Sequence, residues 1–217
     1  MSEKFAGKWE KGVDNRPVTT RIREAIRPPG ELKLRLDYAV KRITIQIQNL
    51  DKATARFSQR DKSIFAKVVS AYSEHDTTRA QVFANELAQL RKMERMMVHA
   101  RLALEQIVLR LSTVSELGDV VSTLAPAVGV MRSVKTNMSA VFPEAERELG
   151  NIGTLLNGII VDAGQSTGMN IDFQAAGDDA QRILNEAATV AEQKVKKKFP
   201  ELPSGTLIFG ETAQTKT

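Results

Sequence analysis

The chain has 217 residues, a net charge of +5 and no cysteine. It can therefore form neither disulfides nor thiolate metal sites, and it suits a reducing compartment. Hydrophobic residues make up 42% of the sequence but aromatic residues only 5%, which favours helices because strands are rich in aromatic and β-branched residues. The sequence has neither a secretory signal nor an apolar run long enough to span a bilayer, so we expect any membrane contact to be peripheral.

Charge is distributed unevenly along the chain. Residues 1–75 hold 16 Lys and Arg against 9 Asp and Glu, a net charge of +7, whereas residues 139–195 hold 3 against 9, a net charge of −6. A basic first part and an acidic later part can attract each other, within one chain or between chains. The alternative is that both surfaces are solvated independently.

Residues 1–30 are expected to form a flexible N-terminal segment, because prolines and a glycine at positions 28–30 mark a firm boundary. Within it, Phe5 and Trp9 lie four residues apart with lysines around them. Such an aromatic pair can insert among lipid headgroups as a short membrane anchor. An unstructured arm and a contact with a neighbouring subunit are equally compatible with these residues.

Two long apolar patterns follow this segment. The first runs from about residue 32 to residue 72 in steps of three and four, with Asp61 as its one clear break, and the second begins after Asp76, a predicted helix N-cap. Neither contains proline or glycine before Gly118. Two such helices joined by a short polar turn bury their apolar faces by folding into an antiparallel hairpin. The sequence thus predicts an elongated all-α fold built on a long antiparallel helical hairpin.

The pattern is weaker after the hairpin. Pro126 and Gly129 leave open whether the second helix bends, breaks or continues there. Pro143 and the glutamates after it predict the start of a short helix that runs towards residue 160. We therefore expect residues 31–161 to form one helical core.

The remaining chain divides into three predicted segments. Residues 162–177 are expected to be a linker, since they contain glycines and polar residues. Residues 178–198 predict an amphipathic C-terminal helix that ends before Pro200. Residues 199–217 are expected to be a tail.

Cations mark one face of the first long helix, roughly opposite its apolar stripe. They are Arg35, Lys41, Arg42, Lys52, Arg56, Arg60 and Lys67. Charge runs are usually solvated faces, but each cation near an acidic bilayer also contributes about 1 kcal/mol of salt-sensitive attraction. DNA phosphate would serve equally well by electrostatics. The helix lacks interleaved aromatic residues and any DNA-reading motif, so anionic lipid is favoured over nucleic acid.

Catalytic, cofactor and metal sites have no support in the sequence. The two histidines, His75 and His99, are too far apart for the i, i+4 pair of a zinc helix. The segment Gly164-Gln-Ser-Thr-Gly168 resembles a phosphate loop only loosely, because no lysine follows it. We therefore expect a protein that is not an enzyme.

A run of positions in the two long helices matches a known family. The positions are Leu36-Asp37, Ile64-Phe65, Val68-Val69, Arg79-Ala80, Ala84-Asn85-Glu86-Leu87 and Arg91-Lys92. They resemble the ESCRT-III-like cell-division proteins of archaea, called CdvB, over roughly residues 30–160. The resemblance implies subunits that polymerise with themselves and with paralogous subunits into curved filaments on a membrane. It also implies a cytoplasmic protein, peripheral on the inner face of the cell membrane at the division site.

The tail carries a second and more specific resemblance, in Phe199, Pro200, Glu201, Leu202 and Pro203. These residues are similar to the motif with which ESCRT-III tails bind the MIT domain of a AAA ATPase, in which an apolar residue precedes each of two prolines. Prolines keep the peptide extended, so that the two apolar side chains project into a groove. The resemblance implies that such an ATPase disassembles the filament. A helix stop followed by chance prolines is the alternative.

The sequence departs from longer family members in one respect. Those members carry a winged-helix-like segment after the motif, whereas 14 residues follow Pro203 here, so the resemblance implies a short paralogue. Two other functions stay open at this point. One is a coiled-coil scaffold for membrane curvature without ATPase coupling, and the other is a basic helical protein that binds nucleic acid.

Overall fold

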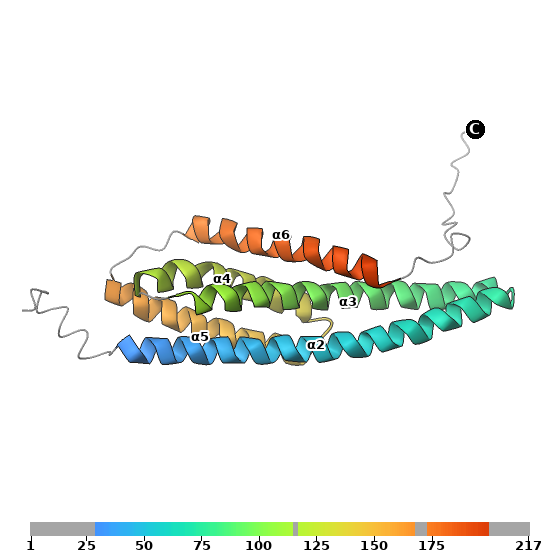
Figure 1. Ribbon diagram of the computed structural model, residues 1–217, viewed down its shortest axis with the longest axis horizontal. Coiled ribbons are helices and arrows are strands. Elements are labelled where there is room, and N and C mark those ends of the chain that lie inside the picture. Colours follow the sequence, from blue (N-terminus) through green and yellow to red (C-terminus); the bar gives the residue numbers. More distant parts are fainter. Residues whose placement is uncertain (1–28, 115–116, 168–172, 200–217) are drawn as a thin grey trace, which may run out of the picture.

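The computed structural model describes residues 29–114, 117–167 and 173–199. These residues form five helices and no strand, which confirms the all-α prediction. The helices are α2 (Pro29–Ser73), α3 (Thr77–Ser112), α4 (Leu117–Met138), α5 (Pro143–Thr167) and α6 (Phe173–Lys198). Figure 1 shows an elongated molecule in which α2 and α3 form one long hairpin, and the other three helices pack along the half of it that lies away from the tip.

The hairpin turn is short, and its residues form hydrogen bonds with the free backbone groups at the ends of both helices. The side chain of Asp76 accepts a hydrogen bond of 2.9 Å from the backbone N–H of Arg79, as the predicted N-cap requires. His75 adopts a left-handed conformation with φ of 56°, which reverses the chain direction between the helices. The predicted antiparallel hairpin is therefore confirmed, with a turn at residues 74–76.

One hydrophobic core joins all five helices. Each helix contributes fully buried side chains to it, for example Ile43, Leu104, Met131, Ile159 and Ile183. Burying large aliphatic side chains away from water is the main favourable term in folding. This core explains why α4, α5 and α6 pack on the hairpin instead of extending away from it.

A second and smaller core holds the outer part of the hairpin together. It consists of Ile64 and Val68 from α2 with Ala84, Leu87 and Leu90 from α3. We call residues 62–90 the distal arm. Figure 1 shows that this arm extends beyond the other three helices, so it is only two helices thick.

The sequence left open whether Pro126 and Gly129 break a helix, and the structure shows that they do not. α4 continues through Pro126. A Cβ atom added to Gly129 would lie only 3.0 Å from the Cβ of Ala180, so the glycine permits a close approach of α4 and α6.

The expected linker is shorter than predicted. Within residues 162–177, α5 continues to Thr167 and α6 already begins at Phe173. Ala163 is buried in the shared core, and such packing outweighs the roughly 1 kcal/mol that a glycine at the next position costs a helix.

Candidate interaction surfaces

Two of the seven predicted cations of α2 are paired with carboxylates of α5. Arg35 forms an ion pair with Asp162, and Arg42 forms one with Glu148. A Cβ atom on Gly158 would lie 3.2 Å from the guanidinium of Arg35, so this glycine leaves room for the arginine to cross α5. Both arginines therefore lie on the flank of α2 that faces α5. This corrects the expectation that all seven cations lie opposite the apolar stripe.

The Arg42 guanidinium also changes the acidity of its partner. Its hydrogen bond holds the pKa of Glu148 below the usual range of a glutamate, because it stabilises the charged carboxylate. The pair is consequently ionised at neutral pH. The basic first helix and the acidic later helix thus meet within one chain.

The other five predicted cations have different surroundings. Arg60 pairs with Glu86 of α3 at 2.8 Å, and Lys67 lies 5.7 Å from the ring centre of Phe83. The remaining three, Lys41, Lys52 and Arg56, are exposed and form no ion pair with any residue that the structure describes. These three lie free to bind an external anion, while Phe5 and Trp9 lie outside the described residues.

The beginning of the predicted tail motif lies against α3. The ring of Phe199 packs with Val98, Ala191 and Val195, and the guanidinium of Arg91 lies 4.9 Å from its centre. Such a cation–π contact is favourable because the face of the ring is electron-rich. Pro200, Glu201, Leu202 and Pro203 lie outside the described residues.

A buried acidic residue holds the end of α6 next to this ring. Lys198 donates a hydrogen bond of 2.7 Å to Glu94, whose side chain is completely buried. Burial raises the pKa of Glu94, because the charged carboxylate loses its hydration, and the nearby Lys198 ammonium only partly opposes this effect. Further along α3, the Nε2 atom of His99 lies 2.9 Å from the carbonyl oxygen of Leu184. These contacts attach α6 to α3.

Another buried ion pair lies one turn from Glu94. Asp61 of α2 and Arg91 of α3 form a 2.7 Å ion pair in which both side chains are largely buried. The one polar break in the apolar stripe of α2 is therefore neutralised by the same arginine that lies against Phe199.

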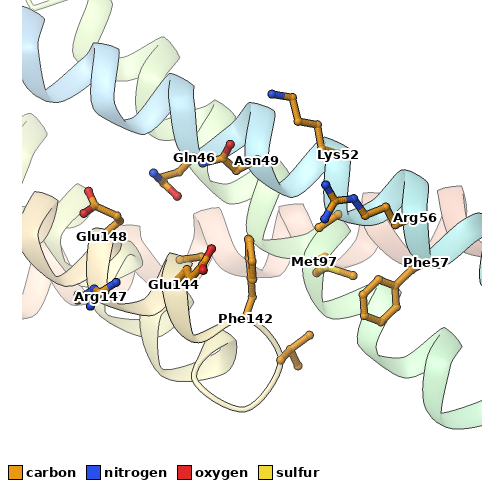
Figure 2. Close-up of a pocket in the computed structure, with 13 residues that line it drawn as sticks. Gln46, Asn49, Lys52, Arg56, Phe57, Met97, Phe142, Glu144, Arg147 and Glu148 are labelled. Atoms are coloured by element: carbon orange, nitrogen blue, oxygen red, sulfur yellow. The ribbon is translucent and has the colours of Figure 1, made fainter.

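A cavity of about 500 Å³ lies where α2, α3, α5 and the connection between α4 and α5 meet. Figure 2 shows the side chains that line it. Phe57, Met97 and Phe142 form its apolar side. Cationic and acidic side chains form its rim, among them Lys52 and Glu144. The lining contains no serine, threonine, histidine or cysteine.

The residues that the structure describes contain neither a metal-binding cluster nor a helix that could span a membrane. Among them, no three histidines or acids gather closely enough to hold a metal ion. None of the five helices is both long and apolar enough to cross a bilayer.

Comparison of the sequence with known proteins shows which family the chain belongs to. Cell division protein B1 of Sulfolobus acidocaldarius is 40% identical over 186 residues, which are 86% of this chain and 85% of that protein. The chain belongs to the cell division protein B family. Cell division protein B of the same organism is 33% identical over 175 residues, which are 79% of this chain and 67% of that protein. No protein-family model matches the chain, and no solved structure matches it.

The resemblance to the CdvB family is thereby confirmed, and the all-α hairpin is consistent with an ESCRT-III-like fold. Sequence reasoning singled out the cations of α2 but missed the carboxylates that bind two of them, Glu148 and Asp162. It also missed Glu94, which binds Lys198. A signal for Glu94 existed, because it follows Leu87 and Leu90 in steps of three and four and is itself three residues before Met97. For the pairing of α2 with α5, the charge distribution indicated an attraction between the basic first part and the acidic later part, but not which residues pair.

Proposed function

We propose that this member of the cell division protein B family is an ESCRT-III-like filament subunit that remodels membrane during cell division. It polymerises with itself and with paralogous subunits on anionic membrane, and a AAA ATPase with an MIT domain disassembles the polymer. Its place is the cytoplasmic side of the cell membrane at the division site. Family membership carries the proposal, since both relatives are named cell division proteins and two such paralogues occur in one organism.

The distal arm supports polymerisation. It exposes the apolar residues Val69, Tyr72 and Val82 on a structure that is two helices thick. Exposed apolar side chains on two adjacent helices, here α2 and α3, are typical of protein contacts. Neighbouring subunits can cover this arm without displacing α4, α5 or α6.

The charges of α2 support binding to anionic lipid. Lys41, Lys52 and Arg56 are exposed in the form described here, and separation of α5 from α2 would add Arg35 and Arg42. The described form is then a closed one, and an open form binds membrane more strongly. Phe5 and Trp9 are proposed to add an N-terminal anchor.

The position of Phe199 bears on the proposed contact with the ATPase. An MIT domain binds the apolar residues of an extended peptide in a groove, and Phe199 is half-buried against α3. Binding therefore requires that Phe199 first leave α3. The proposed motif, Phe199 to Pro203, would be fully available only when the end of α6 has separated.

The membrane part of the proposal is tested by co-sedimentation of the full chain with anionic vesicles and with duplex DNA at matched salt. We expect salt-sensitive binding to the vesicles, and filaments on them in electron micrographs. Binding to DNA but not to vesicles would contradict the proposal and would favour a nucleic-acid-binding protein.

The ATPase part is tested with Leu202→Ala and Phe199→Ala, and with the isolated MIT domain of the ATPase as the ligand. We expect each variant to lose at least tenfold in affinity, because each removes one apolar anchor. Leu202→Ala is the cleaner variant, since Phe199→Ala also removes a contact with α3. If the unchanged chain does not bind the MIT domain, a membrane scaffold without ATPase coupling is the better explanation.

A further inference from the structure

An exposed apolar strip lies at the N-terminal end of α2, on the side turned away from the core. Leu34 is 70% exposed, Tyr38 55% and Ile45 44%. Figure 1 shows that α2 runs along one edge of the molecule. These three large apolar side chains lie within twelve residues of one helix. None of them is buried by another part of the chain, so the strip is available to an external partner.

The spacing of these residues places them on a single line. Positions 34, 38, 41, 45, 48 and 52 follow steps of four and three, so their side chains share one face of the helix. The three apolar residues span about 16 Å of helix at 1.5 Å per residue. Between residues 34 and 52 the other members of the line are Lys41, Gln48 and Lys52, so this stretch contains two cations and no carboxylate, while Glu31 lies one step before it.

The chemistry of this line fits the interfacial region of an anionic bilayer. Leucine and isoleucine side chains are stable at the boundary of the acyl chains, while lysines next to them extend their ammonium groups to the headgroup phosphates. A tyrosine prefers the same depth, with its ring in apolar surroundings and its hydroxyl group hydrated. The guanidinium of Arg42, 5.8 Å from the ring centre of Tyr38, would lie at headgroup level.

A second copy of this helix fits the line less well. In a parallel pair of such faces, Lys41 and Lys52 of one copy would lie close to the same residues of the other, out of water and without carboxylate partners between residues 34 and 52. The steps beyond Ile45 are polar, so a second helix would gain apolar contact over only the first part of the line.

We propose that Leu34, Tyr38 and Ile45 insert into the acyl boundary of an anionic bilayer when the subunit docks. This inference rests on the proposed function and adds an orientation to it. The N-terminal third of α2 penetrates the membrane surface, whereas the later part of the helix contacts headgroups only. The distal arm stays outside the bilayer and available to neighbouring subunits.

The absence of native cysteine permits a direct test in the full chain. Single substitutions Leu34→Cys, Tyr38→Cys and Ile45→Cys carry a polarity-sensitive fluorophore. Matched controls are Val190→Cys on α6 and Leu109→Cys on α3, which are 40% and 67% exposed. Vesicles contain phosphatidylglycerol and phosphatidylcholine in equal parts, with a quencher attached high on the acyl chain, and vesicles of phosphatidylcholine alone serve as the reference.

We expect a blue shift and quenching at positions 34, 38 and 45 with anionic vesicles, and neither at 190 nor at 109. The double variant Leu34→Ser/Ile45→Ser should bind these vesicles about tenfold more weakly, because two apolar side chains no longer leave water. Val190→Ser/Leu109→Ser should bind them as the unchanged chain does. Far-ultraviolet circular dichroism shows whether each variant keeps its helical content.

Three outcomes would overturn the inference, and they differ in what they say of the proposed function. If the chain binds vesicles but the fluorophore at position 38 stays in water, insertion is wrong and electrostatic docking stands. If the label at 38 responds to protein concentration without vesicles, a second copy covers the strip instead. If neither the unchanged chain nor any variant binds anionic vesicles, the proposed membrane function is wrong, and the inference is wrong with it.

Discussion

Two carboxylates occupy positions in the hairpin that its pattern reserves for apolar side chains. Asp61 interrupts the stripe of α2, and Glu94 lies between Leu90 and Met97 in the stripe of α3. Both are buried, Asp61 against Arg91 and Glu94 against Lys198. Burial of a charge is unfavourable unless a partner compensates it, so each position makes the fold sensitive to the loss of one specific cation.

Glu94 should make stability depend on pH. The pKa of its carboxyl group is 4.5 in an unfolded chain and is raised by burial in the folded one. At pH values between these two pKa values, the folded protein therefore holds the proton more often than the unfolded chain does. Stability contributed by this proton is complete below pH 4.5 and is lost as the pH rises through the raised pKa. We expect the melting temperature of the unchanged chain to fall relative to that of Glu94→Gln as the pH rises from 4.5 to neutrality.

Thermal unfolding followed by circular dichroism at several pH values measures this difference. Asp179→Asn is the matched control, because Asp179 forms an exposed ion pair with Arg182 on the same face of one helix. That variant should keep the pH profile of the unchanged chain. A difference between the unchanged chain and Glu94→Gln that is constant over pH would contradict the prediction.

Arg91→Met should destabilise the protein by about 3 kcal/mol, since it leaves Asp61 buried without its partner. Arg60→Met removes a similar 2.8 Å ion pair that is largely exposed, and we expect a loss of about 0.5 kcal/mol or less. Urea unfolding measures both values. Adding Asp61→Asn to Arg91→Met should recover part of the loss, and equal losses in the two single variants would show that burial does not govern these pairs.

At the scale of helices, some cations of α2 form ion pairs within the chain, and others are exposed to solvent. α5 holds Arg35 and Arg42, while Lys41, Lys52 and Arg56 are exposed. Removing the carboxylates of α5 would make the two arginines available to an external anion. The ion pairs of α5 are thus expected to weaken membrane binding in the closed form.

Glu148→Gln/Asp162→Asn should therefore bind anionic vesicles more tightly than the unchanged chain. Two released arginines at about 1 kcal/mol each correspond to an increase of up to about thirtyfold in affinity at low salt. The control Asp179→Asn/Glu192→Gln changes the net charge equally but releases cations of α6 only. Vesicle co-sedimentation over a salt series measures both, and an equal gain in the control would show that net charge alone is responsible.

The sequence predicted the two long helices and their turn better than the later helices, for a physical reason. The stripes of α2 and α3 are uninterrupted by proline or glycine, and Asp76 marks the turn by a local hydrogen bond. In contrast, α5 and α6 extend through Gly164 and Gly177 because their neighbours pack in a core formed by distant segments. Local propensity does not contain that information.

In the candidate surfaces, too, local features could be predicted from the sequence and long-range contacts could not. The cations of α2 could be read from seven-residue spacing, and the tail motif from its prolines. The charge distribution indicated an attraction but not the individual partners, because Asp162 and Glu148 lie more than 100 residues away in sequence from the arginines that they bind. The contact of Phe199 with α3 likewise depends on the whole fold.

At the scale of the molecule, the hairpin has two parts of unequal stability. The part nearer the helix ends belongs to a core of five helices, whereas the distal arm has only its own small core. We expect backbone amides at 62–90 to exchange with deuterium faster than those at 97–107 and 149–160, because local opening of the arm exposes fewer apolar side chains. Exchange followed by mass spectrometry measures this, and uniform protection along α3 would contradict it.

The attachment of α6 has a mechanical consequence. Its last residue, Lys198, and the next residue, Phe199, are held by Glu94 and Arg91 where the five-helix part of the hairpin meets the distal arm. Tension applied to the tail reaches these two contacts before any other contact of the helix. The helix can then detach from its end, one turn after another, and a series of small ruptures needs far less force than the simultaneous shearing of the whole interface.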